Sequence, residues 1–151
     1  METSFTEILR SNNSRSEKAR LIADKIRLSG GYPWAGVYDV KENEIKIISC
    51  AGRSEPLIPS FPKDKGLNGR AVMQGKTVIV NDIDKDEDYL LTFTNTKSEI
   101  VVPVFDKTGK QIVGTIDVEG EKTNAFGDKD VKFLEECAKK ISELWSDDRE
   151  T

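Results

Sequence analysis

The sequence contains no histidine and only two cysteines, and these absences exclude several kinds of active site. Without histidine the chain lacks the commonest general base and zinc ligand, which excludes Ser-His and Cys-His catalysis. Cys50 and Cys137 lie far apart and fit neither a metal-binding spacing nor a disulfide framework. We therefore expect no metal site and no bound cofactor.

A long apolar run and an excess of basic charge are also missing. No stretch of about 20 apolar residues is present to span a membrane, and the N-terminus is polar through Ser16, without the apolar core of a signal peptide. The 23 basic residues are outnumbered by 27 acidic ones, and no basic stripe suited to nucleic acid stands out. We expect a cytoplasmic protein with neither a membrane nor a nucleic-acid partner.

The chain itself reads as one mixed α+β domain over residues 1–151, with a core of about 15–145. Helices are predicted for residues 3–10, 14–30 with Ser14 and Glu17 as a capping box, 66–74, and from a cap at Asp128 to Trp145. Strands are predicted for residues 34–40, 44–51, 77–80, and on both sides of a turn at 106–110. Residues 52–65 are expected to form a long loop, and residues 81–97 an irregular lid. In this arrangement the terminal helices cover one face of an antiparallel sheet, and the other face is left for a small-ligand pocket under loops.

The two strands around the 106–110 turn carry acidic residues at alternate positions. If the loop is the three residues 107–109, with Gly109 in the left-handed conformation, Glu99 lies directly opposite Asp117, and Glu119 lies one pleat further along. The opposite face is then apolar and contains Ile100, Val102, Val104, Ile112, Ile116 and Val118. Like charges that face each other destabilise a sheet. A bound cation, a nearby lysine or exposure to water could offset them.

Five short segments together resemble a GAF domain, and within that superfamily the free methionine-(R)-sulfoxide reductases. They are Trp34-Ala-Gly-Val-Tyr38, Gly66-Leu-Asn-Gly69, Val80-Asn-Asp82, Ser98-Glu-Ile-Val-Val-Pro103 and Gly114-Thr-Ile-Asp-Val-Glu119. The resemblance covers about residues 15–145 and implies a small closed pocket between the sheet and its covering loops. In that pocket, acidic residues hold the amino group of the ligand, and aromatic residues flank its methylsulfinyl end. The pocket residues carried over by position are Trp34, Tyr38, Glu99, Asp117 and Glu119.

The chain departs from these reductases at the positions of their catalytic cysteines. The family's Gly-x-Cys-Gly turn has Asn68 here, the lid position is Thr92, and residues 53–60 contain no cysteine. Asn68 is either a turn residue or a polar ligand contact. Thr92 is a lid residue, and we include both residues among the candidate ligand-binding positions. Thiol chemistry on a sulfoxide needs an attacking thiolate, so only Cys50 could replace the family cysteines. Cys137 is expected in the core of the last helix.

Three functions remain open from the sequence. The first is a binding or sensory module for a small amine-bearing ligand such as free methionine or its sulfoxide. The second is an active free methionine-(R)-sulfoxide reductase that uses Cys50 and an external thiol. The third, a cyclic-nucleotide pocket, is disfavoured because the acidic residues would repel phosphate. We also expect a homodimer that pairs through the terminal helices, including the aromatic Trp145.

Overall fold

The computed structural model describes residues 3–52, 55–87 and 95–146. The helices are α1 (Phe5–Arg10), α2 (Arg15–Gly30), α3 (Gly66–Gln74) and α4 (Asp128–Lys140), with 3-10 turns η1 (Ile83–Lys85) and η2 (Ser142–Trp145). The strands are β1 (Trp34–Val40), β2 (Glu44–Gly52), β3 (Ser60–Pro62), β4 (Val78–Val80), β5 (Ser98–Phe105) and β6 (Ile112–Gly120). None of the helices in these ranges has the length and hydrophobicity of a membrane span.

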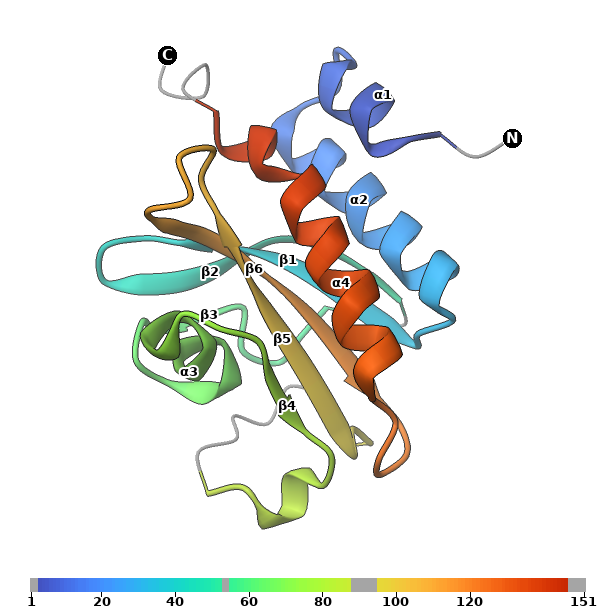
Figure 1. Cartoon of the computed structure of the whole chain (residues 1–151), viewed down its shortest axis with the longest axis vertical. Coiled ribbons are helices and arrows are strands. Elements are labelled where there is room, and N and C mark those ends of the chain that lie inside the picture. Colours follow the sequence, from blue (N-terminus) through green and yellow to red (C-terminus); the bar gives the residue numbers. More distant parts are fainter. Residues whose placement is uncertain (1–2, 53–54, 88–94, 147–151) are drawn as a thin grey trace.

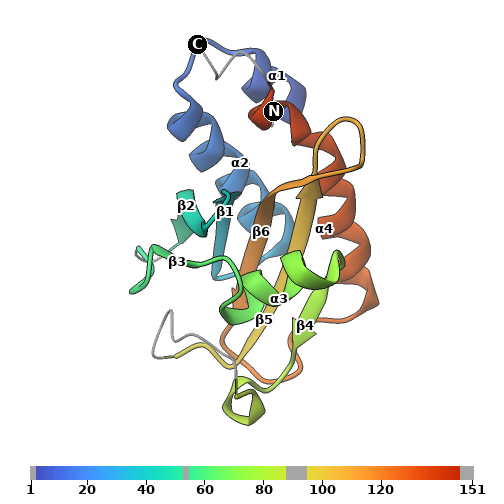
Figure 2. The same ribbon diagram turned by 90° about the vertical axis from the view of Figure 1, so that its left-hand side faces the viewer.

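The strands form one antiparallel sheet in the order β3-β2-β1-β6-β5-β4 (Figure 1). Helices α2 and α4 lie side by side on one face of this sheet, and α3 lies against β5 and β6 on the other face (Figure 2). The predicted α+β architecture is therefore confirmed. Because α3 covers the centre of the second face, the residues beneath it are removed from water.

The main core lies between the sheet and the two long helices. Helix α2 buries one stripe of small and branched residues, namely Ala19, Ile22, Ala23 and Ile26. The strands contribute the alternate apolar residues Ile100, Val102, Val104, Ile116 and Val118. From α4 come Leu134, Cys137 and Ala138, which confirms the predicted core position of Cys137.

Local signals in the sequence explain where these helices begin and end. The Ser14 side chain accepts a hydrogen bond from Glu17 N–H at 3.1 Å and caps α2, and Gly31 ends α2 in the left-handed conformation. The reciprocal capping box that we predicted for Ser14 is found one helix earlier, between Ser4 and Glu7. At α4 the N-cap is Gly127 rather than Asp128.

The β5–β6 hairpin differs from the predicted register. Its loop has four residues rather than three, because the Asp106 N–H donates to the Gln111 carbonyl at 2.8 Å. A bulge at Val113 then separates the Phe105–Ile112 pair from the Val104–Gly114 pair. The two shifts add up to two residues, so Glu99 lies opposite Glu119 and not opposite Asp117. A two-residue shift keeps every later side chain on its predicted face.

Other predictions change in detail. The bulge turns Val113, rather than Ile112, toward the helix-covered core. The long loop after β2 contains the short edge strand β3, and the last helix ends at Lys140 before η2. Trp145 is buried, and its indole N–H donates to Asp39 at 2.7 Å. It therefore offers no aromatic surface to a second copy, and the homodimer stays a prediction.

Candidate functional site

The candidate site is the face of β1, β6 and β5 that lies toward α3. Residues directly opposite each other in an antiparallel pair share a face. The pairing places Trp34 beside Glu119 and Glu119 beside Glu99. The next two rows on this face are Gly36, Asp117 and Val101, and then Tyr38, Thr115 and Pro103. The structure thus brings all three predicted acidic residues and both predicted aromatic residues onto one face.

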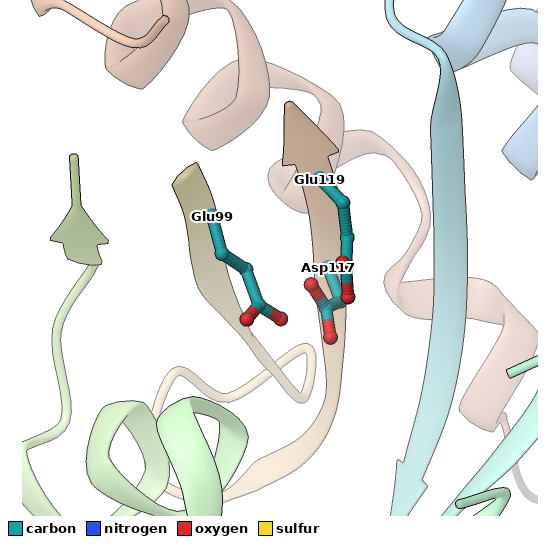
Figure 3. A group of neighbouring side chains, drawn as sticks. All are labelled: Glu99, Asp117 and Glu119. Atoms are coloured by element: carbon teal, nitrogen blue, oxygen red, sulfur yellow. The ribbon is translucent and has the colours of Figure 1, made fainter. Parts of the chain in front are cut away.

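The three carboxyl groups converge beneath α3. Glu99 extends from β5 toward Asp117 and Glu119 on β6, as Figure 3 shows. One carboxylate oxygen from each residue lies within 4.8 Å of the others. The exposed fractions of Glu99, Asp117 and Glu119 are only 3%, 1% and 2%. Three acidic groups this close and this dry could hold an ammonium group, or a divalent cation through its preferred oxygen ligands.

Short polar side chains hold two of these carboxyl groups in place. The Asn68 amide donates to Asp117 Oδ2 at 2.8 Å, and the Thr115 hydroxyl donates to Asn68 Oδ1 at 2.5 Å. Because Thr115 can only donate to the carbonyl end of the amide, this pair fixes which end of Asn68 faces Asp117. The Thr96 hydroxyl donates to Glu119 Oε1. The other oxygen of Asp117, Oδ1, is buried and has no hydrogen-bond partner in the described ranges.

Burial and mutual repulsion change how these acids titrate. Burial raises the pKa of Glu99 well above its ordinary value, and the charges of Asp117 and Glu119 raise it further. The pKa of Asp117 is also raised by burial, but hydrogen bonds with Glu99 and Asn68 oppose the rise. Burial and repulsion therefore favour the protonated form more strongly at Glu99 than at Asp117. Neither residue forms a salt bridge to lysine or arginine within the described ranges.

The aromatic residues of the site form the wall beside the acids. The Trp34 ring lies over Gly36, where a Cβ would be 2.4 Å from its Cη2 atom. Only glycine at position 36 leaves this space, so the indole can lie flat against the sheet. Tyr38 is also fully buried, and its ring centroid lies 6.0 Å from that of Phe61. Burial first, and then the nearby acidic charges, raise the pKa of Tyr38 well above its usual range.

A small cavity separates the acids from α3. It is lined by Tyr38, Ile58, Phe61, Gly66, Leu67, Asn68, Glu99 and Asp117. Its interior has room for about one water molecule. Asn68 lies in the first turn of α3 and lines this cavity. The residue that we predicted as a polar ligand contact is therefore part of the candidate site. Thr92 lies outside the described residues.

Cys50 faces the same side of the sheet but does not line the cavity. It pairs with Gly36, which pairs with Asp117, so two strand spacings, or about 10 Å, separate the two backbones. Burial, and then the Glu55 carboxylate 3.8 Å away, raise the pKa of the Cys50 thiol to about 11. A nucleophilic cysteine needs a lowered pKa. The environment of Cys50 favours the neutral thiol instead.

Our sequence reasoning missed three residues of this site. Thr96 and Thr115 are buried hydroxyl donors, and Gly36 provides the space for the indole. Thr115 has the same strand parity as Asp117 and Glu119, so its position on this face could have been inferred. Thr96 precedes β5, and no periodic pattern marked it.

The sequence of this chain is similar to a known protein family and to individual proteins. A family model described as GAF domain matches residues 16–145. GAF domain-containing protein A of Dictyostelium discoideum is 36% identical over 108 residues, which cover 70% of this chain and 65% of that protein. The free methionine-R-sulfoxide reductase of Saccharomyces cerevisiae is 34% identical over 112 residues, covering 72% of this chain and 61% of that protein. The chain therefore spans less than two thirds of both curated relatives.

A solved structure extends the likeness to most of the chain. The type II free methionine-R-sulfoxide reductase from Thermoplasma acidophilum superposes with a TM-score of 0.78 at 26% sequence identity. The match covers 87% of this chain and 94% of the Thermoplasma chain.

Proposed function

Since the chain belongs to the GAF domain family, we propose that it binds a small amine-bearing ligand, free methionine or methionine sulfoxide, as a binding or sensory module. The acidic cluster beneath α3 is the binding site in this proposal. The proposal does not include the cysteine chemistry that a reductase needs.

One observation carries the proposal: buried acids face a cavity without a cationic side chain to balance them. Glu99 and Asp117 have at most 3% of their surface exposed, and no salt bridge to either is found in the described structure. Burying a charge is costly unless the charge is paired. A ligand ammonium group would supply the pairing, and its arrival would favour the ionised form of Glu99.

The aromatic wall and the relatives favour a methionine-like ligand. Trp34 and Tyr38 flank the acids and could contact a thioether or methylsulfinyl group, because sulfur interacts favourably with aromatic rings. The relatives named above include free methionine-R-sulfoxide reductases. A phosphate would meet the negative charge of the cluster, which disfavours a cyclic nucleotide.

The test is calorimetry and thermal denaturation with L-methionine, methionine sulfoxide and cyclic nucleotides. We expect the amino acids to raise the melting temperature and the nucleotides to leave it unchanged. Replacing a carboxylate acceptor removes a charge-assisted hydrogen bond worth about 1.5–3 kcal/mol. Glu99→Gln and Asp117→Asn should therefore weaken binding about tenfold to a hundredfold. Glu42→Gln, at an exposed position, is the matched control. Tight nucleotide binding with no amino-acid binding would reject the proposal.

The competing function is a reductase that works through Cys50. A pKa of about 11 leaves little thiolate at neutral pH, and the distance argued above keeps Cys50 away from the acids. We expect no turnover of methionine sulfoxide with dithiothreitol, and we expect Cys50→Ser to leave ligand binding unchanged. Robust turnover that disappears in Cys50→Ser would establish the reductase instead.

A further inference from the structure

The first turn of α3 presents unused hydrogen-bond donors to the cavity. Gly66, Leu67 and Asn68 are the first three residues of this nine-residue helix, and all three line the cavity. The first intrahelical bond to the cap runs from Gly69 N–H to the Lys65 carbonyl at 3.0 Å. Lys65 gives no side-chain cap, and within the described ranges no group accepts from the three earlier N–H groups. Such N–H groups, together with the helix dipole, favour an anion.

A second, independent observation points to a ligand in the same cavity. Asp117 also lines it, is 1% exposed, and has its Oδ1 atom buried without a hydrogen-bond partner in the described structure. Asp117 meets α3 through the Asn68 side chain, at 2.8 Å, and not through the backbone N–H groups. In the described structure the cavity therefore has one acceptor without a hydrogen-bond partner, Asp117 Oδ1, at its sheet end, and N–H groups without an acceptor at its helix end.

We propose that the N-terminus of α3 is the subsite for the ligand's carboxylate, while Asp117 and Glu99 hold its ammonium group. This inference rests on the proposed function and adds the anionic half of recognition. Asn68 joins the two ends of the cavity, because its backbone belongs to the first turn of α3 and its side-chain amide donates to Asp117 Oδ2 at 2.8 Å. A zwitterion also brings no net charge into a site that is already negative.

Other ligand types fit only half of this cavity. A simple amine would satisfy the acids but leave the α3 N–H groups without acceptors. A phosphate or a simple carboxylate would satisfy the helix but would meet the negative cluster. Because the cavity holds about one water molecule, a whole amino acid enters only if residues that line the cavity move outward.

The first experiment varies the ligand. Calorimetry compares L-methionine with L-methioninamide and 3-(methylthio)propylamine, which keep the amine but lose the carboxylate, and with N-acetyl-L-methionine, which loses the ammonium group. We expect each of the three analogues to bind at least about tenfold more weakly than methionine, because each gives up a charge-assisted hydrogen bond.

The outcomes separate the two proposals. If methioninamide and the amine bind as tightly as methionine, the carboxylate subsite is overturned and the proposed function stands. If methionine and its sulfoxide fail to bind, the proposed function is overturned. A panel of the other free amino acids and their amides then tests the subsite alone. A preference for acids over amides supports the subsite, and no preference, or no binding at all, overturns it.

The second experiment varies the helix. Proline is tolerated in the first turn of a helix but has no N–H, so Leu67→Pro removes one donor. Leu67→Ala is the matched control, because it removes the same buried side chain and keeps the N–H. We expect Leu67→Pro to bind methionine about tenfold more weakly than Leu67→Ala, and both to bind methioninamide equally. Equal methionine binding by two folded variants would contradict the subsite, and the ligand series decides if Leu67→Pro does not fold.

Discussion

The two faces of the β5–β6 hairpin are built from alternate residues of the same strands, yet they have opposite chemistry. On one face Ile100, Val102, Ile116 and Val118 pack beneath α2 and α4. On the other face Glu99, Asp117 and Glu119 lie beneath α3 and are almost equally buried. Both faces are dry, but only one of them is apolar.

This difference separates stability from binding. Burying one branched aliphatic side chain contributes about 1.5–3 kcal/mol to stability, whereas buried charges cost free energy until they are paired. The α2–α4 face therefore stabilises the fold, and it allows the α3 face to keep an arrangement that is unfavourable without a ligand. The two faces share strands β5 and β6. The packing of α2 and α4 on one face therefore also positions the acids on the other face.

The largest loss of stability is expected from a substitution in the apolar face. Ile116→Ala removes a fully buried side chain from the centre of the core and should lower the free energy of unfolding by about 2–5 kcal/mol. Urea denaturation measures the loss. Ile112→Ala, on the same strand but only half-buried and outside the core cluster, should cost much less. Equal losses for the two variants would show that the face does not carry the stability assigned to it.

A smaller effect is expected from the hydrogen bonds that hold the acidic face. Thr96→Val keeps the shape of the side chain but removes the hydroxyl that donates to Glu119. Leaving a buried acceptor without this donor should cost about 1–3 kcal/mol. Thr123→Val, at an exposed position, is the control and should change stability little. If Thr96→Val were neutral in chemical denaturation, Thr96 would have no part in holding Glu119.

The acidic face should also give the empty protein a characteristic pH dependence. Glu99 has a raised pKa in the folded state, so between its ordinary value near 4.5 and the raised value the folded chain binds a proton that the unfolded chain has lost. Stability from this group is therefore full below pH 4.5 and is lost as pH rises toward the folded pKa, by at most about 1.4 kcal/mol per pH unit.

Glu99→Gln removes this contribution, so the free energy of unfolding of the variant should increase relative to that of the wild type as pH rises. The measurement is the difference in unfolding free energy between the two proteins from pH 4.5 upward, with Glu42→Gln as the control. The same proton must leave when an ammonium group pairs with an ionised Glu99, so methionine affinity should rise with pH over this range. A wild type that becomes more stable than Glu99→Gln at higher pH would contradict the raised pKa of Glu99.

The smallest effect is expected within the α3 face, at Cys50. With a pKa of about 11, only about one thiol in 10,000 is ionised at pH 7, and the thiolate is the reactive form. Alkylation by iodoacetamide should therefore be slow at neutral pH and accelerate as pH approaches 11. Mass spectrometry of the native protein measures the rate of alkylation. Fast alkylation of Cys50 at pH 7 would show an activated cysteine and would favour the reductase.

Much of the fold could be predicted because its signals are local. The Ser14 cap, the glycine at position 31 and the period of the apolar residues in α2 depend on neighbours within one or two turns. Strand β1 has the predicted bounds for the same reason. The short edge strand β3 was missed because three residues are too few for an alternating pattern, and its pairing with β2 comes from a segment elsewhere in the chain.

For the site, the sequence alone determined which residues of each single strand share a face, because side chains alternate along a strand. Glu99 was grouped correctly with Asp117 and Glu119 because the extra loop residue and the bulge, neither of which was foreseen, add up to an even shift of two residues. Only the tertiary structure decided that Glu99 lies opposite Glu119, that Asn68 reaches Asp117 from 49 positions away, and that α3 directs its N-terminus at the acids. These depend on how separate elements pack, and packing is set by the fit of many distant side chains rather than by any local pattern.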